Sequence, residues 1–91
     1  MPESNLKLIN PLGLHARAAA KLVDVAKQFA SDITIHFGGQ AVDAKSIMAL
    51  LMLGAAVDSE LSIHTSGEDA EQALEAIAEL INAGFYELDG S

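Results

Sequence analysis

The chain has 91 residues and a mass of 9.5 kDa, which is the size of one small domain. Apolar residues make up 51% of it, so an intrinsically disordered chain is not expected. Five basic and thirteen acidic residues give a net charge of −8, which opposes binding to nucleic acid or an acidic membrane surface. The absence of cysteine excludes disulfides, thiolate zinc sites and cysteine nucleophiles.

The beginning of the chain has no basic segment followed by a long apolar one, so we expect no signal peptide. The longest apolar run, over 47–53, is far shorter than the roughly 20 residues that span a bilayer. We therefore expect one cytoplasmic domain over residues 1–91, without membrane insertion and without a nucleic-acid partner.

Hydrophobic periodicity predicts a strand, a helix, two strands, a helix, a strand and a helix. The expected strands are 5–9, 32–37, 40–44 and 60–65, and the expected helices are 16–29, 47–53 and 68–83. Gly38-Gly39 favours a hairpin turn, Ser46 a helix N-cap, and Gly54 and Gly84 helix ends. The strands have one polar face and the helices one apolar stripe. This pattern predicts an α+β fold with one antiparallel sheet, covered by helices on one face and open to water on the other.

His15 follows a Pro/Gly loop over 10–13 and directly precedes a helix. A side chain there faces the free N–H groups of the first turn, which with the helix dipole attract anions. We expect this positive end to disfavour imidazolium and to leave a neutral nucleophile near pH 7. Arg17 can reach an anion held on His15. The pattern suits a histidine that accepts a phosphoryl group; the alternative is that His15 only caps the helix beside a solvated arginine.

His36 and His64 lie on the polar sides of their strands and are expected to be solvated. The alternative is a metal ion shared between them, which lacks a third ligand at suitable spacing. We therefore expect no metal. No Gly-x-x-x-x-Gly-Lys-Ser/Thr loop is present, so no nucleoside triphosphate cradle and no cofactor are expected. A phosphate on His15 would then have to come from another phosphorylated protein.

The helix over 47–53 has no polar residue between Ser46 and Gly54. One face can pack on the sheet, and we expect the other to be an exposed docking surface; the alternative is burial by loops. A phosphate on Ser46 would add about −2 charge at a helix start beside Lys45, weakening the binding of an acidic partner. The alternative is that the serine only caps.

Two segments, Gly13–Ala20 and Lys45–Met48, with 28 residues between Arg17 and Ser46, resemble the HPr family. These are the histidine phosphocarrier proteins of the bacterial phosphoenolpyruvate-dependent sugar phosphotransferase system. The resemblance covers roughly residues 4–84. It implies an open-faced β-sandwich of βαββαβα order, with strand order 1-4-2-3 and three helices on one face.

The resemblance implies that His15 accepts a phosphoryl group on Nδ1 from phosphorylated Enzyme I and passes it to permease A domains. Arg17 matches the phosphate-stabilising arginine, with the backbone of Ala16 and Arg17 as the anion hole. Ser46 matches the serine that HPr kinase/phosphorylase modifies. The expected docking residues are Leu12, Ile47, Met48, Leu51 and Met52. We thus expect a monomeric carrier rather than an enzyme in the strict sense.

The chain departs from the family pattern at two positions: Ala18 replaces a frequent proline, and Leu12 replaces a small polar residue. The segments 46–53 and 81–85 also look similar to the nitrogen-related, NPr-like branch, which acts in regulation. An NPr-like carrier is therefore one alternative. The others are a regulatory module that docks through Ile47–Leu53 without carrying phosphate, and a minimal phosphatase that uses His15 and Arg17.

Overall fold

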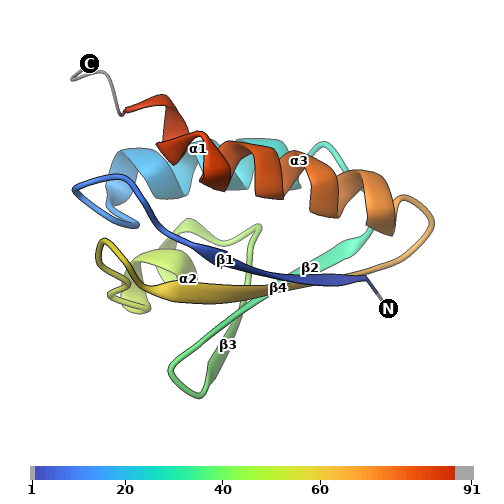
Figure 1. Ribbon diagram of the computed structural model, residues 1–91. Helices are drawn as coiled ribbons and strands as arrows, with labels where there is room; N and C mark the ends of the chain where they lie inside the picture. Colours follow the sequence, from blue (N-terminus) through green and yellow to red (C-terminus); the bar gives the residue numbers. More distant parts are fainter. Residues whose placement is uncertain (1, 88–91) are drawn as a thin grey trace.

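The computed structural model describes residues 2–87, and its order of elements is the one that the periodicity predicts (Figure 1). The strands are β1 (Glu3–Lys7), β2 (Asp32–Phe37), β3 (Gln40–Asp43) and β4 (Glu60–Ser66). The helices are α1 (Ala16–Ala26), α2 (Ile47–Met52) and α3 (Ala70–Asn82), followed by a 3₁₀ turn, η1 (Gly84–Tyr86). No helix within 2–87 is both long and apolar enough to cross a bilayer.

The four strands form one antiparallel sheet in the order β1-β4-β2-β3. Helices α1 and α3 lie side by side across one face, and α2 packs beside α1 and β3 (Figure 1). The predicted fold class and strand order are thereby confirmed.

The core lies between the sheet and the helices. Alternate residues of β2 and β4 point into it, because successive side chains of a strand face opposite sides. Ile35 and Ile63 are paired across β2 and β4 and are both fully buried. Helix α1 contributes a stripe of small and branched residues, and α3 contributes a second; their buried members are Ala18, Ala19, Leu22, Val23, Ala26, Ala70, Ala73, Ile77, Leu80 and Ile81.

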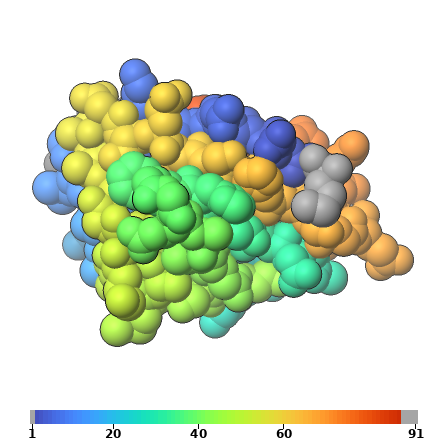
Figure 2. Space-filling view, turned by 90° about the horizontal axis from the view of Figure 1, so that it is seen from below, coloured from blue at the N-terminus to red at the C-terminus, as the bar shows by residue number. Residues whose placement is uncertain are grey.

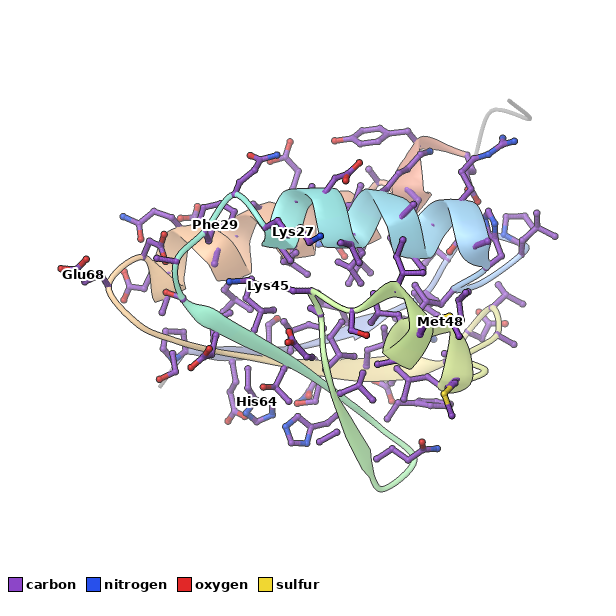
Figure 3. The ribbon with its side chains drawn as sticks, turned by 180° about the vertical axis from the view of Figure 1, so that it is seen from behind. Lys27, Phe29, Lys45, Met48, His64 and Glu68 are labelled. Carbon is purple, nitrogen blue, oxygen red and sulfur yellow. The ribbon has the colours of Figure 1, made fainter. Side chains whose placement is uncertain are left out.

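The other face of the sheet is open, as Figure 2 shows with the green β2–β3 hairpin in front. His36 is exposed and His64 half-buried there, and Figure 3 shows His64 on the side of the sheet away from α1 and α3. Their ring centroids are 4.2 Å apart. Within the described residues, however, no group of three or more His, Asp or Glu side chains could hold a metal ion.

Three predicted elements are wrong by two or more residues at one end or both: the first strand, the first helix, and the last helix, which begins at Ala70 and not at 68. The first strand is Glu3–Lys7, not 5–9, because Leu8 bonds to the loop after α2: its N–H donates to Ser59 O and its carbonyl accepts from Asp58 N–H. The first helix ends at Ala26, not at 29. The N–H groups of Gln28 and Phe29 bond three residues back, so the chain tightens into a turn there. Phe29 still packs against the core, which explains its helical phase in the sequence.

Asp69 ties the start of α3 to the loop between α1 and β2. Its carboxylate accepts hydrogen bonds from the backbone N–H groups of Ala30 and Ser31 and from the Ser31 hydroxyl. The bond from the Ser31 side chain, then that from the Ala30 backbone, holds the pKa of Asp69 below its usual value. A carboxyl with a depressed folded-state pKa stabilises the fold above its unfolded pKa, and this stabilisation is lost as the pH falls through the folded value.

Replacing Asp69 with Asn should therefore lower the free energy of unfolding at pH 7, because the hydrogen bonds lose their charge-assisted strength. The difference from the wild type should begin to shrink as the pH falls below the unfolded pKa of about 4, and should be lost as the pH passes through the lower folded-state pKa and Asp69 becomes protonated. Denaturant unfolding at several pH values measures it. Glu68→Gln, at the exposed neighbouring position, is the control and should change little (Figure 3). A difference that stays constant down to low pH would contradict the assignment.

Candidate functional site

His15 caps the amino end of α1. Its backbone is extended, with φ −81° and ψ 179°, and its Nδ1 accepts a hydrogen bond from the backbone N–H of Arg17 at 3.3 Å. The imidazole therefore lies where the sequence predicts it, against the first amides of the helix. Because Nδ1 accepts this bond, it carries no proton in this arrangement.

The second ring nitrogen of His15 faces a carboxylate that the sequence analysis missed. Nε2 lies 2.7 Å from Glu87 Oε2, and the side chains of His15 and Glu87 are 25% and 9% exposed. A carboxylate only accepts hydrogen bonds, so it holds the proton on Nε2 and leaves the lone pair on Nδ1. The predicted neutral charge state of the ring stays a prediction.

Glu87 reaches His15 through an unusual turn after α3. Gly84, Phe85 and Tyr86 have φ angles of +63°, +56° and +61°, so three successive residues are left-handed. This conformation costs an L-residue about 1–2 kcal/mol, and only glycine adopts it freely. The Phe85 side chain is fully buried in the core and holds the turn in place. In the sequence, the signal that the chain folds back here is an aromatic residue, Phe85, directly after the helix-ending Gly84.

Asn10 holds the other oxygen of the Glu87 carboxylate. Its Nδ2 donates to Glu87 Oε1 at 3.0 Å and to Gly13 O at 2.7 Å. Burial would raise the pKa of Glu87, but the hydrogen bonds from Asn10 and His15, helped by the positive charge of Lys21, outweigh burial and lower it. Glu87 is thus a carboxylate at neutral pH, joined to both the loop and the ring.

The loop before His15 is pressed against the segment that follows α2. Leu14 N–H donates to Ala55 O at 2.9 Å, and a Cβ on Gly13 would lie 2.6 Å from that same oxygen. Gly13 also has a φ of +62°. Glycine is required at this position for both reasons, and the contact fixes the approach of the chain to His15.

Arg17 and Ala18 follow His15 on α1. Arg17 is exposed, and its side chain makes no hydrogen bond or ion pair to any other residue of 2–87, so its guanidinium can turn toward an anion at His15. Ala18 is fully buried. A proline would fit this first turn, but Ala18 fills it without loss of helical structure.

The predicted docking residues divide into exposed and half-buried ones. Leu12, Met48 and Met52 are 71%, 69% and 76% exposed, and Ile47 is partly exposed. Leu51 is half-buried against the core, and Leu50 is fully buried beneath the helix. Figure 3 labels Met48 on α2. The outer face of α2 is therefore apolar, and no other part of residues 2–87 covers it.

Ser46 is the N-cap of α2, and its Oγ accepts from Ala49 N–H at 3.2 Å. Lys45, its neighbour, does not turn toward it: Nζ donates to Phe29 O at 2.9 Å (Figure 3). Ser46 thus has the capping geometry that the sequence predicts. The lysine would have to leave Phe29 to meet a phosphate there.

Several known proteins similar to this chain are described as phosphocarrier proteins. Residues 2–83 match the family described as "PTS HPr component phosphorylation site". The chain is 47% identical over 88 residues to the phosphocarrier protein HPr of Pseudomonas aeruginosa, covering 96% of this chain and 98% of that protein. It superposes with a TM-score of 0.93 on HPr-C-His from Thermoanaerobacter tengcongensis, which is 37% identical, with 96% and 98% of the two chains covered.

A second structure from Thermoanaerobacter tengcongensis is described as an HPr dimer. It is 36% identical to this chain, covers 93% of it and 98% of its own length, and has a TM-score of 0.75. The expected monomer therefore stays a prediction.

Gly13→Ala should destabilise the chain more than Gly38→Ala does. Both residues have left-handed φ angles, but only Gly13 has a backbone oxygen where a Cβ would go, and Gly38 has nothing within 4 Å. We expect Gly38→Ala to cost about 1–2 kcal/mol of unfolding free energy, and Gly13→Ala to exceed it. Denaturant unfolding of both variants measures the difference. Equal losses would show that the Gly13–Ala55 contact has no special role.

Proposed function

Because the chain belongs to the HPr family of phosphocarrier proteins of the phosphotransferase system, we propose that His15 is its phosphoryl acceptor. The proposal further takes phosphorylated Enzyme I as the donor and a permease A domain as the acceptor. One observation carries it: the two nitrogens of His15 face opposite partners, an amide donor at Nδ1 and a carboxylate at Nε2. This arrangement leaves Nδ1 as the nucleophile.

Transfer begins when the lone pair of Nδ1 attacks the phosphorus of the phosphohistidine on Enzyme I. A new N–P bond forms at Nδ1 as the old P–N bond breaks, and its electron pair returns to the donor nitrogen. The proton on Nε2 stays in place and is held by Glu87. The same steps in reverse transfer the phosphoryl group from His15 to the acceptor. In both directions the protein has mainly to position the reacting groups and to stabilise their charge.

A phosphoryl group on Nδ1 would lie at the amino end of α1. The N–H of Arg17, which now bonds to the ring, would turn to a phosphoryl oxygen. The N–H of Ala16 is beside it, and the exposed guanidinium of Arg17 can add a bidentate contact. Leu12, at the position where a small polar residue is frequent in the family, offers no hydrogen bond to the group.

The exposed apolar face of α2 supports docking to partner proteins. Met48 and Met52 adapt to different surfaces because their side chains are unbranched and flexible. The same face serves a donor and an acceptor in turn if both approach His15 from this side. A sugar permease domain and a regulatory domain of the nitrogen-related branch are both compatible acceptors.

The test is phosphorylation by Enzyme I and phosphoenolpyruvate, followed by intact mass and by acid treatment of the product. We expect the wild type to gain one acid-labile phosphoryl group and His15→Ala to gain none. His36→Ala and His64→Ala, on the open face of the sheet, are the controls and should still be labelled. A wild type that takes no phosphate would leave only a regulatory module, and hydrolysis of a small phosphate ester by the isolated chain would favour a phosphatase.

Ser46 is proposed as a regulatory site for an HPr kinase/phosphorylase. Ser46→Asp adds a negative charge beside the α2 face and should slow phosphorylation of His15 on the order of ten-fold, because like charges slow association with an acidic partner. Ser46→Asn is the matched control, since Asn also caps helices well but carries no charge. Initial rates of labelling by Enzyme I measure both. Equal rates for the two variants would exclude an electrostatic effect.

A further inference from the structure

Lys21 joins α1 to the left-handed turn that delivers Glu87. It lies one helical turn after Arg17, on the same face of α1, and is half-buried. Its Nζ donates a hydrogen bond to Phe85 O at 2.6 Å. Figure 1 shows the red η1 turn next to the light-blue first turns of α1. The acceptor carbonyl stands two residues before Glu87, so the ammonium acts on the main chain of the turn itself.

The turn needs such a restraint because its backbone is not in a favoured conformation. Phe85 and Tyr86 are left-handed without being glycine. The buried Phe85 ring fixes one end of the turn, but Tyr86 is exposed and has no such anchor. With Phe85 O held, the main chain leaves the turn in the direction that places Glu87 against His15 and Asn10.

The position of Lys21 also matters electrostatically. Its charge is one of the influences that keep Glu87 ionised, together with Asn10 and His15. The ammonium therefore acts on the carboxylate in two ways, through the main chain and through space.

We propose that Lys21 is a positioning residue for phosphoryl transfer: its bond to Phe85 O sets the turn so that Glu87 keeps the proton of His15 on Nε2. The proposal rests on the proposed function of His15. Lys21 itself touches neither the ring nor the phosphoryl group, so its effect must pass through Glu87.

Lys21→Met removes the donor and the charge while keeping an unbranched side chain of similar length. The readout is the tautomer of His15 in the unphosphorylated protein, taken from long-range proton–nitrogen NMR spectra. We expect the wild type to carry the proton on Nε2 and Lys21→Met to show a substantial share of the Nδ1–H form. The rate of labelling by Enzyme I should fall about two- to ten-fold, the range that loss of one hydrogen bond gives.

Three further variants separate positioning from general effects. Lys27→Met removes the same charge from the exposed end of α1, as Figure 3 shows, and should leave tautomer and rate unchanged. Lys21→Arg keeps a cationic donor and should restore both. In a double-mutant cycle, Lys21→Met should add nothing to Glu87→Ala, because the residue through which it acts is gone.

The proposal is overturned if Lys21→Met lowers only the unfolding free energy and leaves the tautomer unchanged. It is equally overturned if Lys27→Met has the same effect, or if the two changes at 21 and 87 add independently. The tautomer is measured without a phosphoryl donor. Failure of the wild type to accept phosphate would therefore be a separate result, against the function of His15 and not against the geometry set by Lys21.

Discussion

The imidazole of His15 is held between two groups of opposite electrostatic character. On one side, the backbone N–H of Arg17 donates to Nδ1 at the start of a helix; on the other, the Glu87 carboxylate accepts from Nε2. Either contact alone would orient the ring, but the two together also decide which nitrogen bears the proton. A histidine has only two places for that proton, so fixing one nitrogen defines the chemistry of the other.

The groups around this ring come from two distant parts of the chain, and the sheet supplies none of them. The loop before α1 brings Asn10, the helix brings the amide, and the end of the chain after α3 brings Glu87. The sheet instead supports α1 and α3, which pack side by side on one of its faces. Their common packing is what allows residues 10 and 87 to share a hydrogen bond.

Sequence reasoning predicted the parts of this arrangement that depend on local patterns. Alternation placed β2, and helical periodicity with a Pro/Gly loop placed His15 at an N-cap. The sequence did not predict the role of Glu87. That role depends on contacts with His15 and Asn10, 72 and 77 residues away, and on a left-handed turn that hydrophobic periodicity does not indicate. The strand ends before Leu8 for a similar reason, since Leu8 bonds to a distant segment, whereas the first helix ends before Phe29 because its last turn tightens locally.

Only one residue separates the buried Phe85 from Glu87, so an insertion or deletion between them would move the carboxylate. Phe85 belongs to the hydrophobic core, so its burial fixes the position of the Glu87 carboxylate two residues later. The spacing of these two positions is therefore constrained, while the side chain of Tyr86 between them is exposed to solvent. Burial of the Phe85 ring therefore also brings Glu87 to Nε2 of His15.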